Sequence, residues 1–175
     1  MSVGMAGVHR FDHVAIAVRD LARAVLLFRD VLGGRFIGGG DDTSLRIRTL
    51  QLQLPPGTKI ELMQPLDDHG YLARYLDDRG EGFHHATFFV DDVPTAVAAV
   101  EAAGFEVVDT SLTRPSWHET FVRPSSGFGT LIQLAASDLR WSEPIRDDLQ
   151  AEDVIAGRVV WQDDRPWFRH ERPGS

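Results

Sequence analysis

Apolar and polar residues alternate along several short stretches of the chain, and this alternation predicts β-strands. Six segments share the pattern: 11–18, 45–54, 58–64, 83–90, 118–123 and 129–135. Successive side chains of a strand point to opposite faces, so each segment is expected to have one face that packs against helices and one that points away from them.

Two further stretches carry apolar residues at helical spacing, and each follows an aspartate. In the first, the apolar positions are Leu21, Ala24, Val25, Phe28 and Val31 or Leu32; in the second, they are Val93, Ala96, Val97 and Val100. Asp20 and Asp92 are predicted to accept hydrogen bonds from the first free amides of these helices. Gly33 and Gly104 fit the left-handed position that ends a helix.

A shift of the chain by 72 residues brings the two halves into register. Phe11 then falls on Phe83 and His13 on His85, and "GTKIEL" falls on "GTLIQL", so that Glu61 matches Gln133. Matches at both ends of a unit under one shift indicate an internal repeat. We interpret 9–65 and 83–135 as two βαβββ modules, 66–82 as a linker helix and 136–175 as a C-terminal extension.

Strand alternation predicts that four polar residues face away from the packed helices: His13, Glu61, His85 and Gln133. If the two modules curl into one cup, all four point into its concavity. Such a set of nitrogen and oxygen ligands suits Mn, Fe, Co, Ni or Zn. A single histidine in a strand is more often a hydrogen-bonded core residue, but the repeat and the shared face favour a divalent metal site.

Composition limits the kinds of binding partner and the cellular compartment that we expect for the protein. The 175 residues carry 26 acidic against 18 basic side chains, a net charge of −8, which argues against nucleic acid and anionic membranes as partners. The absence of cysteine excludes disulfides and zinc–thiolate sites. The first residues lack the apolar core of a signal peptide, so we expect a soluble cytoplasmic protein.

Residues 9–135 resemble the vicinal oxygen chelate superfamily, which includes glyoxalase I, extradiol dioxygenases, methylmalonyl-CoA epimerases and bleomycin-resistance proteins. The stretches "DHVAIAV", "TKIELMQPL", "YLDDRGEGFHH" and "RPSSGFGTLIQL" look closest to the epimerases. The resemblance implies an α+β fold in which tandem βαβββ modules form a cupped mixed sheet with helices on the convex face. It also implies a divalent metal ion held by His13, Glu61, His85 and Gln133. A homodimer is expected.

Two departures from the epimerase pattern concern the acid–base groups. Epimerases usually carry a glutamate at the position of Gln133, where it is both ligand and proton carrier, and a further acid on the strand that matches 45–54. Glu61 is one remaining catalytic candidate. Glu119 is another, since alternation places it on one face with Trp117, Phe121 and Arg123. The same pattern is expected for a solvated acid at the edge of a strand that has no catalytic role. Epimerisation is expected to be slow unless Glu119 or a water replaces the missing acid.

The resulting hypothesis is a metal-dependent isomerase or lyase that forms an enolate next to a carbonyl, with an acyl-CoA thioester as the favoured substrate. Candidate substrate-binding residues are Gln51, Gln53, Phe89, Phe121 and Arg123. Two alternatives remain open: a glyoxalase I-like lyase or dioxygenase, and a non-catalytic binding protein of the bleomycin-resistance type. The extension contains Trp141, Trp161 and Trp167 and is expected to pack over the cup or onto a partner subunit.

Overall fold

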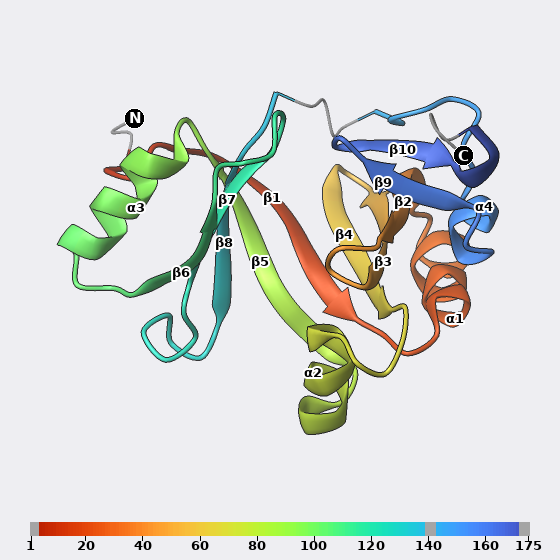
Figure 1. Cartoon of the computed structure of the whole chain (residues 1–175), viewed down its shortest axis with the longest axis horizontal. Coiled ribbons are helices and arrows are strands. Elements are labelled where there is room, and N and C mark those ends of the chain that lie inside the picture. Colours follow the sequence, from red (N-terminus) through yellow and green to blue (C-terminus); the bar gives the residue numbers. More distant parts are fainter. Residues whose placement is uncertain (1–3, 139–142, 172–175) are drawn as a thin grey trace. The chain divides into compact units, whose positions relative to one another are not determined.

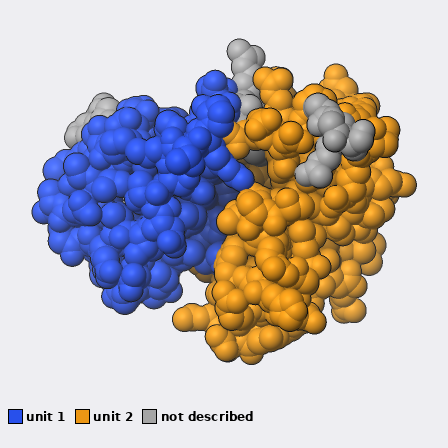
Figure 2. Space-filling model, in the orientation of Figure 1, with its two compact units in different colours: residues 1–14, 84–139 blue, residues 15–83, 140–175 orange. Residues whose placement is uncertain are grey.

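The computed structural model describes residues 4–138 and 143–171, and the chain divides into two compact units (Figures 1 and 2). One is formed by residues 1–14 and 84–139 and is here called the β5–β8 unit; the other is formed by 15–83 and 140–175 and is called the β2–β4 unit. Strand β1 (Val8–Ala17) belongs to both, because the division falls after Val14. Most of the C-terminal extension thus belongs to the same unit as most of the first repeat.

The β5–β8 unit contains the strands of the second repeat and the start of β1. Its strands are β5 (Gly82–Val90), β6 (Val107–Ser111), β7 (His118–Val122) and β8 (Leu131–Ala136). β5 and β8 run parallel, whereas β8, β7 and β6 are antiparallel neighbours, so the sheet is mixed. Helix α3 (Val93–Ala102) covers one face, where Val93 and Ala96 pack against Val90 and Leu134.

The β2–β4 unit is built on an antiparallel sheet extended by the C-terminal residues. Its strands are β2 (Arg35–Asp42), β3 (Ile47–Leu54), β4 (Thr58–Pro65), β9 (Val159–Gln162) and β10 (Arg165–Phe168). Its helices are α1 (Leu21–Val25), which continues into the π-helix η1 (Leu26–Val31), then α2 (Tyr71–Arg79), α4 (Ala151–Ile155) and the short η2 (Arg169–Glu171). β9 runs parallel to β2, and the fold is α+β with a mixed sheet, as predicted.

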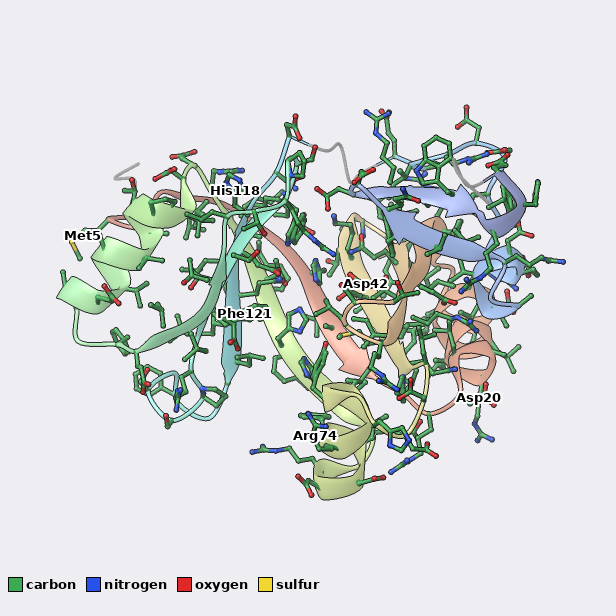
Figure 3. All side chains as sticks on the ribbon, viewed as in Figure 1. Met5, Asp20, Asp42, Arg74, His118 and Phe121 are labelled. Atoms are coloured by element: carbon green, nitrogen blue, oxygen red, sulfur yellow. The ribbon has the colours of Figure 1, made fainter. Side chains whose placement is uncertain are left out.

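The predicted helix starts and ends are confirmed in both repeats. Asp20, labelled in Figure 3, accepts a hydrogen bond from the backbone N–H of Arg23 at 3.0 Å. Asp92 accepts from the hydroxyl and the backbone N–H of Thr95, and these hydrogen bonds lower the pKa of the Asp92 carboxyl. Gly33 and Gly104 have φ angles of 76° and 86°, in the left-handed region that glycine adopts at little steric cost.

The end of the first helix differs from the prediction. Val31 and Leu32 were expected on the buried stripe, but they are 68% and 49% exposed. The cause is η1, in which the N–H of Leu32 bonds to the carbonyl of Leu27, five residues earlier. A π-turn holds more residues than an α-turn, so the side chains after it rotate away from the positions that a 3.6-residue period assigns.

Helices cover both faces of the β2–β4 sheet. On one face, the buried side chains are those of Leu50, Leu52 and Leu62, and α4 packs there, with Val154 close to Gly39. On the opposite face, to which Glu61 belongs, Leu72 and Leu76 of α2 pack in a cluster with other buried apolar residues. These are Ala15, Ala17, Ile47 and Met63. The predicted linker helix therefore closes one end of the face that carries Glu61.

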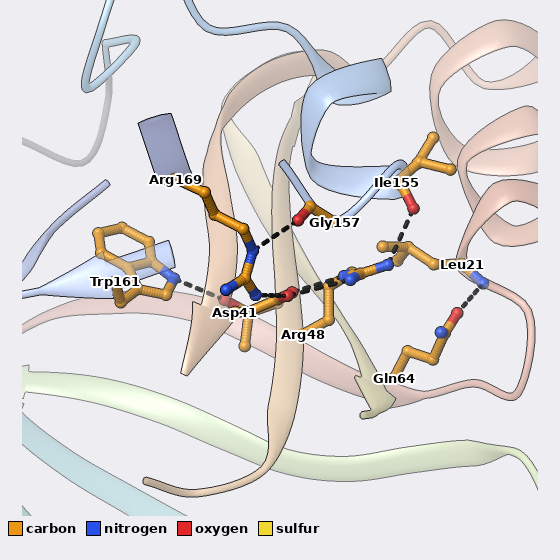
Figure 4. Close-up of polar contacts among 9 residues, drawn as sticks. Leu21, Asp41, Arg48, Gln64, Ile155, Gly157, Trp161 and Arg169 are labelled. Atoms are coloured by element: carbon orange, nitrogen blue, oxygen red, sulfur yellow. Dashed lines mark hydrogen bonds and ion pairs between the residues drawn. The ribbon is translucent and has the colours of Figure 1, made fainter. Parts of the chain in front are cut away.

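The extension is fastened to the β2–β4 unit by an ion-pair cluster around Asp41 (Figure 4). The Asp41 carboxylate is 2% exposed and accepts hydrogen bonds from Arg48 at 2.6 and 3.0 Å and from Arg169 at 2.7 Å. Arg48 also donates to the carbonyl of Ile155, and Arg169 to that of Gly157. Trp141 lies outside the described residues.

Within residues 4–138 and 143–171, no helix combines the length and the apolar character needed to cross a membrane.

Candidate active site

The two histidines that the repeat aligns lie side by side in the β5–β8 unit. His13 comes from β1 and His85 from β5, and they are only 2% and 4% exposed. Their ring centroids are 5.7 Å apart, and a ring nitrogen of one lies within 4.8 Å of a ring nitrogen of the other. His84 is half-buried and brings its Nδ1 within 2.8 Å of His85 Nδ1. The repeat therefore selected the histidine that faces His13.

Asp12 sets the orientation of the His13 ring. One carboxylate oxygen of Asp12 lies 2.9 Å from His13 Nδ1, and its other oxygen lies 2.7 Å from the Arg10 guanidinium. With Nδ1 directed at a carboxylate, Nε2 is the nitrogen that points into the site. A carboxylate behind a histidine is the usual arrangement around metal-binding imidazoles, because it fixes the ring and raises its basicity.

Thr87 joins His13 to Gln133. Its hydroxyl lies 3.0 Å from His13 Nε2 and donates to Gln133 Oε1 at 2.6 Å. The parallel register of β5 and β8 pairs Thr87 with Gln133, and alternation puts both on the face of His85. His13 Nε2 and Gln133 Oε1 therefore contact the same buried hydroxyl, and three of the four predicted ligands converge within one unit.

Glu119 lies directly behind Gln133. The Gln133 side-chain amide donates to Glu119 Oε2 at 2.6 Å, and the indole N–H of Trp117 donates to the same oxygen at 2.7 Å. This contact follows from the antiparallel pairing of β7 with β8, in which Phe121 pairs with Gln133 and Glu119 with the next residue on the same face. Glu119 is half-buried and held in place by two donors, so a carboxylate stands beside the position from which one is missing.

In the β2–β4 unit, Glu61 also forms a pair with a glutamine. β3 and β4 place Gln51 opposite Glu61, and Gln51 Nε2 donates to Glu61 Oε1 at 3.2 Å. Gln53 lies on the same face, opposite Lys59, and its side-chain oxygen accepts from Arg35. Gln51, Gln53 and Glu61 therefore lie on one face of this sheet, and substrate contact by the two glutamines stays a prediction.

The other candidate substrate residues differ in their surroundings. Phe121, labelled in Figure 3, places its ring 6.2 Å from that of His85. Phe89 is almost fully buried under the Arg10 guanidinium, 4.6 Å from its ring centroid, and packs edge-on against Trp117. Arg123 is exposed beyond the end of β7 and forms an ion pair with Glu106. Substrate contact by these three residues stays a prediction.

Sequence reasoning missed Asp12, Thr87 and Trp117 as parts of the site. Asp12 precedes His13 directly, and a carboxylate next to a candidate metal ligand is a signal that could have been used. Thr87 lies two residues after His85 and so shares its face, but its contacts depend on the register of β5 with β8, which alternation alone does not give.

The residues present fit a divalent transition metal. Two imidazole nitrogens and an amide oxygen are borderline and hard donors, which favour Zn, Co, Ni, Fe or Mn over soft ions. Asp12 orients the His13 ring, and the donor atoms of His13 and Gln133 lie near each other because both contact the Thr87 hydroxyl.

Comparison with known proteins identifies the family to which the chain belongs. The family model of the glyoxalase/bleomycin resistance protein/dioxygenase superfamily matches residues 12–121. The ethylmalonyl-CoA/methylmalonyl-CoA epimerase of Cereibacter sphaeroides is 31% identical over 129 residues, which cover 71% of this chain and 96% of that protein.

Two solved structures show the same fold. Methylmalonyl-CoA epimerase from Mycobacterium tuberculosis superposes with a TM-score of 0.69 at 29% identity and covers 79% of this chain and 93% of that one. A Streptomyces coelicolor methylmalonyl-CoA epimerase variant in complex with 2-nitronate-propionyl-CoA gives 0.67 at 26% identity and covers 75% and 99%. The chain therefore belongs to the glyoxalase/bleomycin resistance protein/dioxygenase superfamily, and within it is similar to methylmalonyl-CoA epimerases.

Proposed function

We propose that the chain is a divalent-metal-dependent isomerase that moves a proton at the carbon next to the thioester carbonyl of an acyl-CoA, in the manner of a methylmalonyl-CoA epimerase. The observation that carries the proposal is the hydrogen-bonded series from His13 through Thr87 and Gln133 to Glu119. Similarity to an ethylmalonyl-CoA/methylmalonyl-CoA epimerase supports the substrate class.

The metal ligands in this proposal are His13, His85 and Gln133, with Glu61 as the fourth donor that the repeat predicts. Support for Glu61 comes from the repeat, in which it occupies the position that Gln133 occupies in the second half. A bound divalent ion would draw electron density from the thioester oxygen and so make the neighbouring C–H bond more acidic.

Proton transfer is assigned to the carboxylates. Inverting a carbon needs one group to take the proton from one face and another to return it on the opposite face. Glu119 is proposed as one of these groups, since its carboxylate is held beside Gln133 by two donors. Glu61 is proposed as the second. Gln133 cannot take up or release a proton in this way. In the proposal its side-chain oxygen is the metal donor, while its amide N–H orients Glu119.

The proposal is tested by the exchange of the α-proton of methylmalonyl-CoA in deuterium oxide, followed by NMR. The metal-loaded protein should exchange the proton, and protein stripped with a chelator should regain exchange only when a divalent metal is returned. Binding of a transition metal without any exchange of the α-proton would contradict the proposed acyl-CoA isomerase. It would favour the glyoxalase-like or binding-protein alternatives.

A further inference from the structure

Strand β2 has three consecutive glycines in its interior, Gly38, Gly39 and Gly40. Glycine weakens a strand because it adds conformational entropy to the unfolded chain and offers no side chain to pack, so such a run indicates that other atoms come close to the backbone. Register places Gly38 opposite Gln51 and Gly40 opposite Thr49.

Gly38 and Gly40 lie on the same face of the sheet as Glu61. Paired residues of antiparallel strands project on the same side, and Gln51 is paired with Glu61 as well as with Gly38. Gly38, Gln51 and Glu61 thus form one row across β2, β3 and β4. A side chain at Gly38 would extend this row outward.

The C-terminal extension fills the space that these glycines leave. A Cβ atom at Gly38 would lie 2.6 Å from Cδ1 of Ile145, and one at Gly40 would lie 3.5 Å from Cδ1 of Trp161. The indole N–H of Trp161 donates to Thr49 Oγ1 at 3.2 Å, which fixes the ring above β2 and β3 (Figure 4). Ile145 and Trp161 are both half-buried, so part of each side chain is accessible.

We infer that Ile145 and Trp161 form an apolar wall that limits the length of the acyl group accepted on the Glu61 face. Strands are about 4.8 Å apart, so β2 lies about 10 Å across the sheet from β4. An acyl group held near Glu61 passes over Gln51 and then meets Ile145. The site therefore takes short-chain acyl-CoA thioesters and rejects long ones. This inference rests on the proposed function and adds the substrate's chain length to it.

Both wall residues lie in the C-terminal extension, outside the internal repeat. The match to the family model ends at residue 121, before both of them. The Cereibacter sphaeroides relative is matched over 96% of its own length but leaves 29% of this chain without a counterpart, since the match covers 71%.

The test compares the affinity of a short and a long non-epimerisable thioester, propionyl-CoA and hexanoyl-CoA, by calorimetric titration of the metal-loaded protein. The wild type should bind propionyl-CoA more tightly. Ile145→Ala and Trp161→Ala should each shift the ratio of the two dissociation constants toward hexanoyl-CoA by about tenfold or more, as expected when a hydrophobic pocket gains room for added methylenes.

Three further variants separate a wall from a merely structural role. Ile145→Phe adds volume, so it should shift the ratio in the opposite direction. Trp161→Phe keeps most of the ring and should leave the ratio close to that of the wild type. Glu152→Gln, which breaks the ion pair between Glu152 and Arg29 on another part of the extension, should not change the ratio.

The outcomes distinguish this inference from the proposed function. If both thioesters bind and the ratio is the same in wild type, Ile145→Ala and Ile145→Phe, the wall is refuted while the acyl-CoA site stands. If the wild type binds neither thioester, the proposed function fails and the wall fails with it.

Discussion

The two repeats each bring one glutamate and one glutamine together on the face that points away from α1 or α3, but in opposite order. In the first repeat, the last strand carries Glu61 and the strand beside it carries Gln51. In the second, the last strand carries Gln133 and the strand beside it carries Glu119. Each repeat thus keeps one carboxylate beside one amide, and we propose that Glu119 supplies the carboxylate that position 133 lacks.

The edges of the two sheets differ as well. The outer strand of the first repeat, β2, is covered by β9 and β10 of the extension. The outer strand of the second repeat, β6, is irregular: its register with β7 shifts between Val108 and Ser111, and Asp109 has a φ angle of 53°. Bulges and coverings both keep an edge strand from pairing with other chains. One repeat thus uses added residues and the other uses backbone irregularity.

The largest expected effect is the loss of metal binding when a histidine is replaced. It tests whether the alignment of the two repeats identifies the metal ligand correctly. His85→Ala should abolish binding of a divalent transition metal, measured by metal analysis after dialysis, because it removes one donor. His84→Ala removes only a residue that contacts His85 and should weaken affinity by about 10–100-fold without abolishing binding. Equal loss in both variants would refute the assignment of His85 as the ligand.

The next effect concerns the ion-pair cluster that fastens the C-terminal extension to the β2–β4 unit. Asp41→Asn leaves Arg48 and Arg169 without a buried anion, and the free energy of unfolding should fall by about 3 kcal/mol in urea titration. The matched control is Asp30→Asn, which breaks the exposed pair with Arg29 and should cost much less than Asp41→Asn, because exposed ion pairs are weakened by solvent and salt. Similar losses in both would mean that the Asp41 cluster does not fasten the extension.

A smaller loss of stability should differ between substitutions on the two faces of β2. Gly39→Ala would place a Cβ 2.4 Å from the backbone oxygen of Thr49, which cannot move without disturbing β3, so a loss of about 1–3 kcal/mol is expected. At Gly38 the nearest atom is the end of the flexible Ile145 side chain, and Gly38→Ala should be tolerated better. Thermal unfolding of the two variants compares them directly, and the reverse ranking would contradict the described packing.

The smallest effect tests the feature that the repeats share. Asp20→Ala and Asp92→Ala each remove a helix N-cap, and each should lower the free energy of unfolding, by less than Gly39→Ala does. Asp92 also accepts from the Thr95 hydroxyl, so its replacement should cost slightly more. Chemical denaturation measures both. A loss in only one repeat would show that the capping is not equivalent.

Local patterns in the sequence predict much of this molecule. Alternation and the repeat are enough to place His13, His85 and Gln133 on one face, and capping chemistry is enough to place both helix starts. Strand β2 has no such pattern, because Gly38, Gly39 and Gly40 are neither apolar nor polar side chains. Its strand conformation depends on β3 and on Ile145 and Trp161 of the extension, which lie more than 100 residues further along the chain.

The contacts around Gln133 could not be predicted for a similar reason. Alternation assigns Glu119 to a face but not to a partner, because the partner is set by the register between β7 and β8. Likewise, the helical period cannot show that a π-turn interrupts the first helix after Val25. The pattern thus predicts elements and faces, whereas pairings across the sheet and irregular turns depend on tertiary packing.

The most direct test of the central claim, that Glu119 supplies the carboxylate that position 133 lacks, is α-proton exchange of methylmalonyl-CoA by three proteins. The wild type should exchange, and Glu119→Gln should lose about 10²–10⁴-fold in rate, the usual contribution of an acid–base group. The double variant Glu119→Gln/Gln133→Glu reverses the pair and should recover most of the rate. Equal exchange by the wild type and Glu119→Gln would contradict the claim.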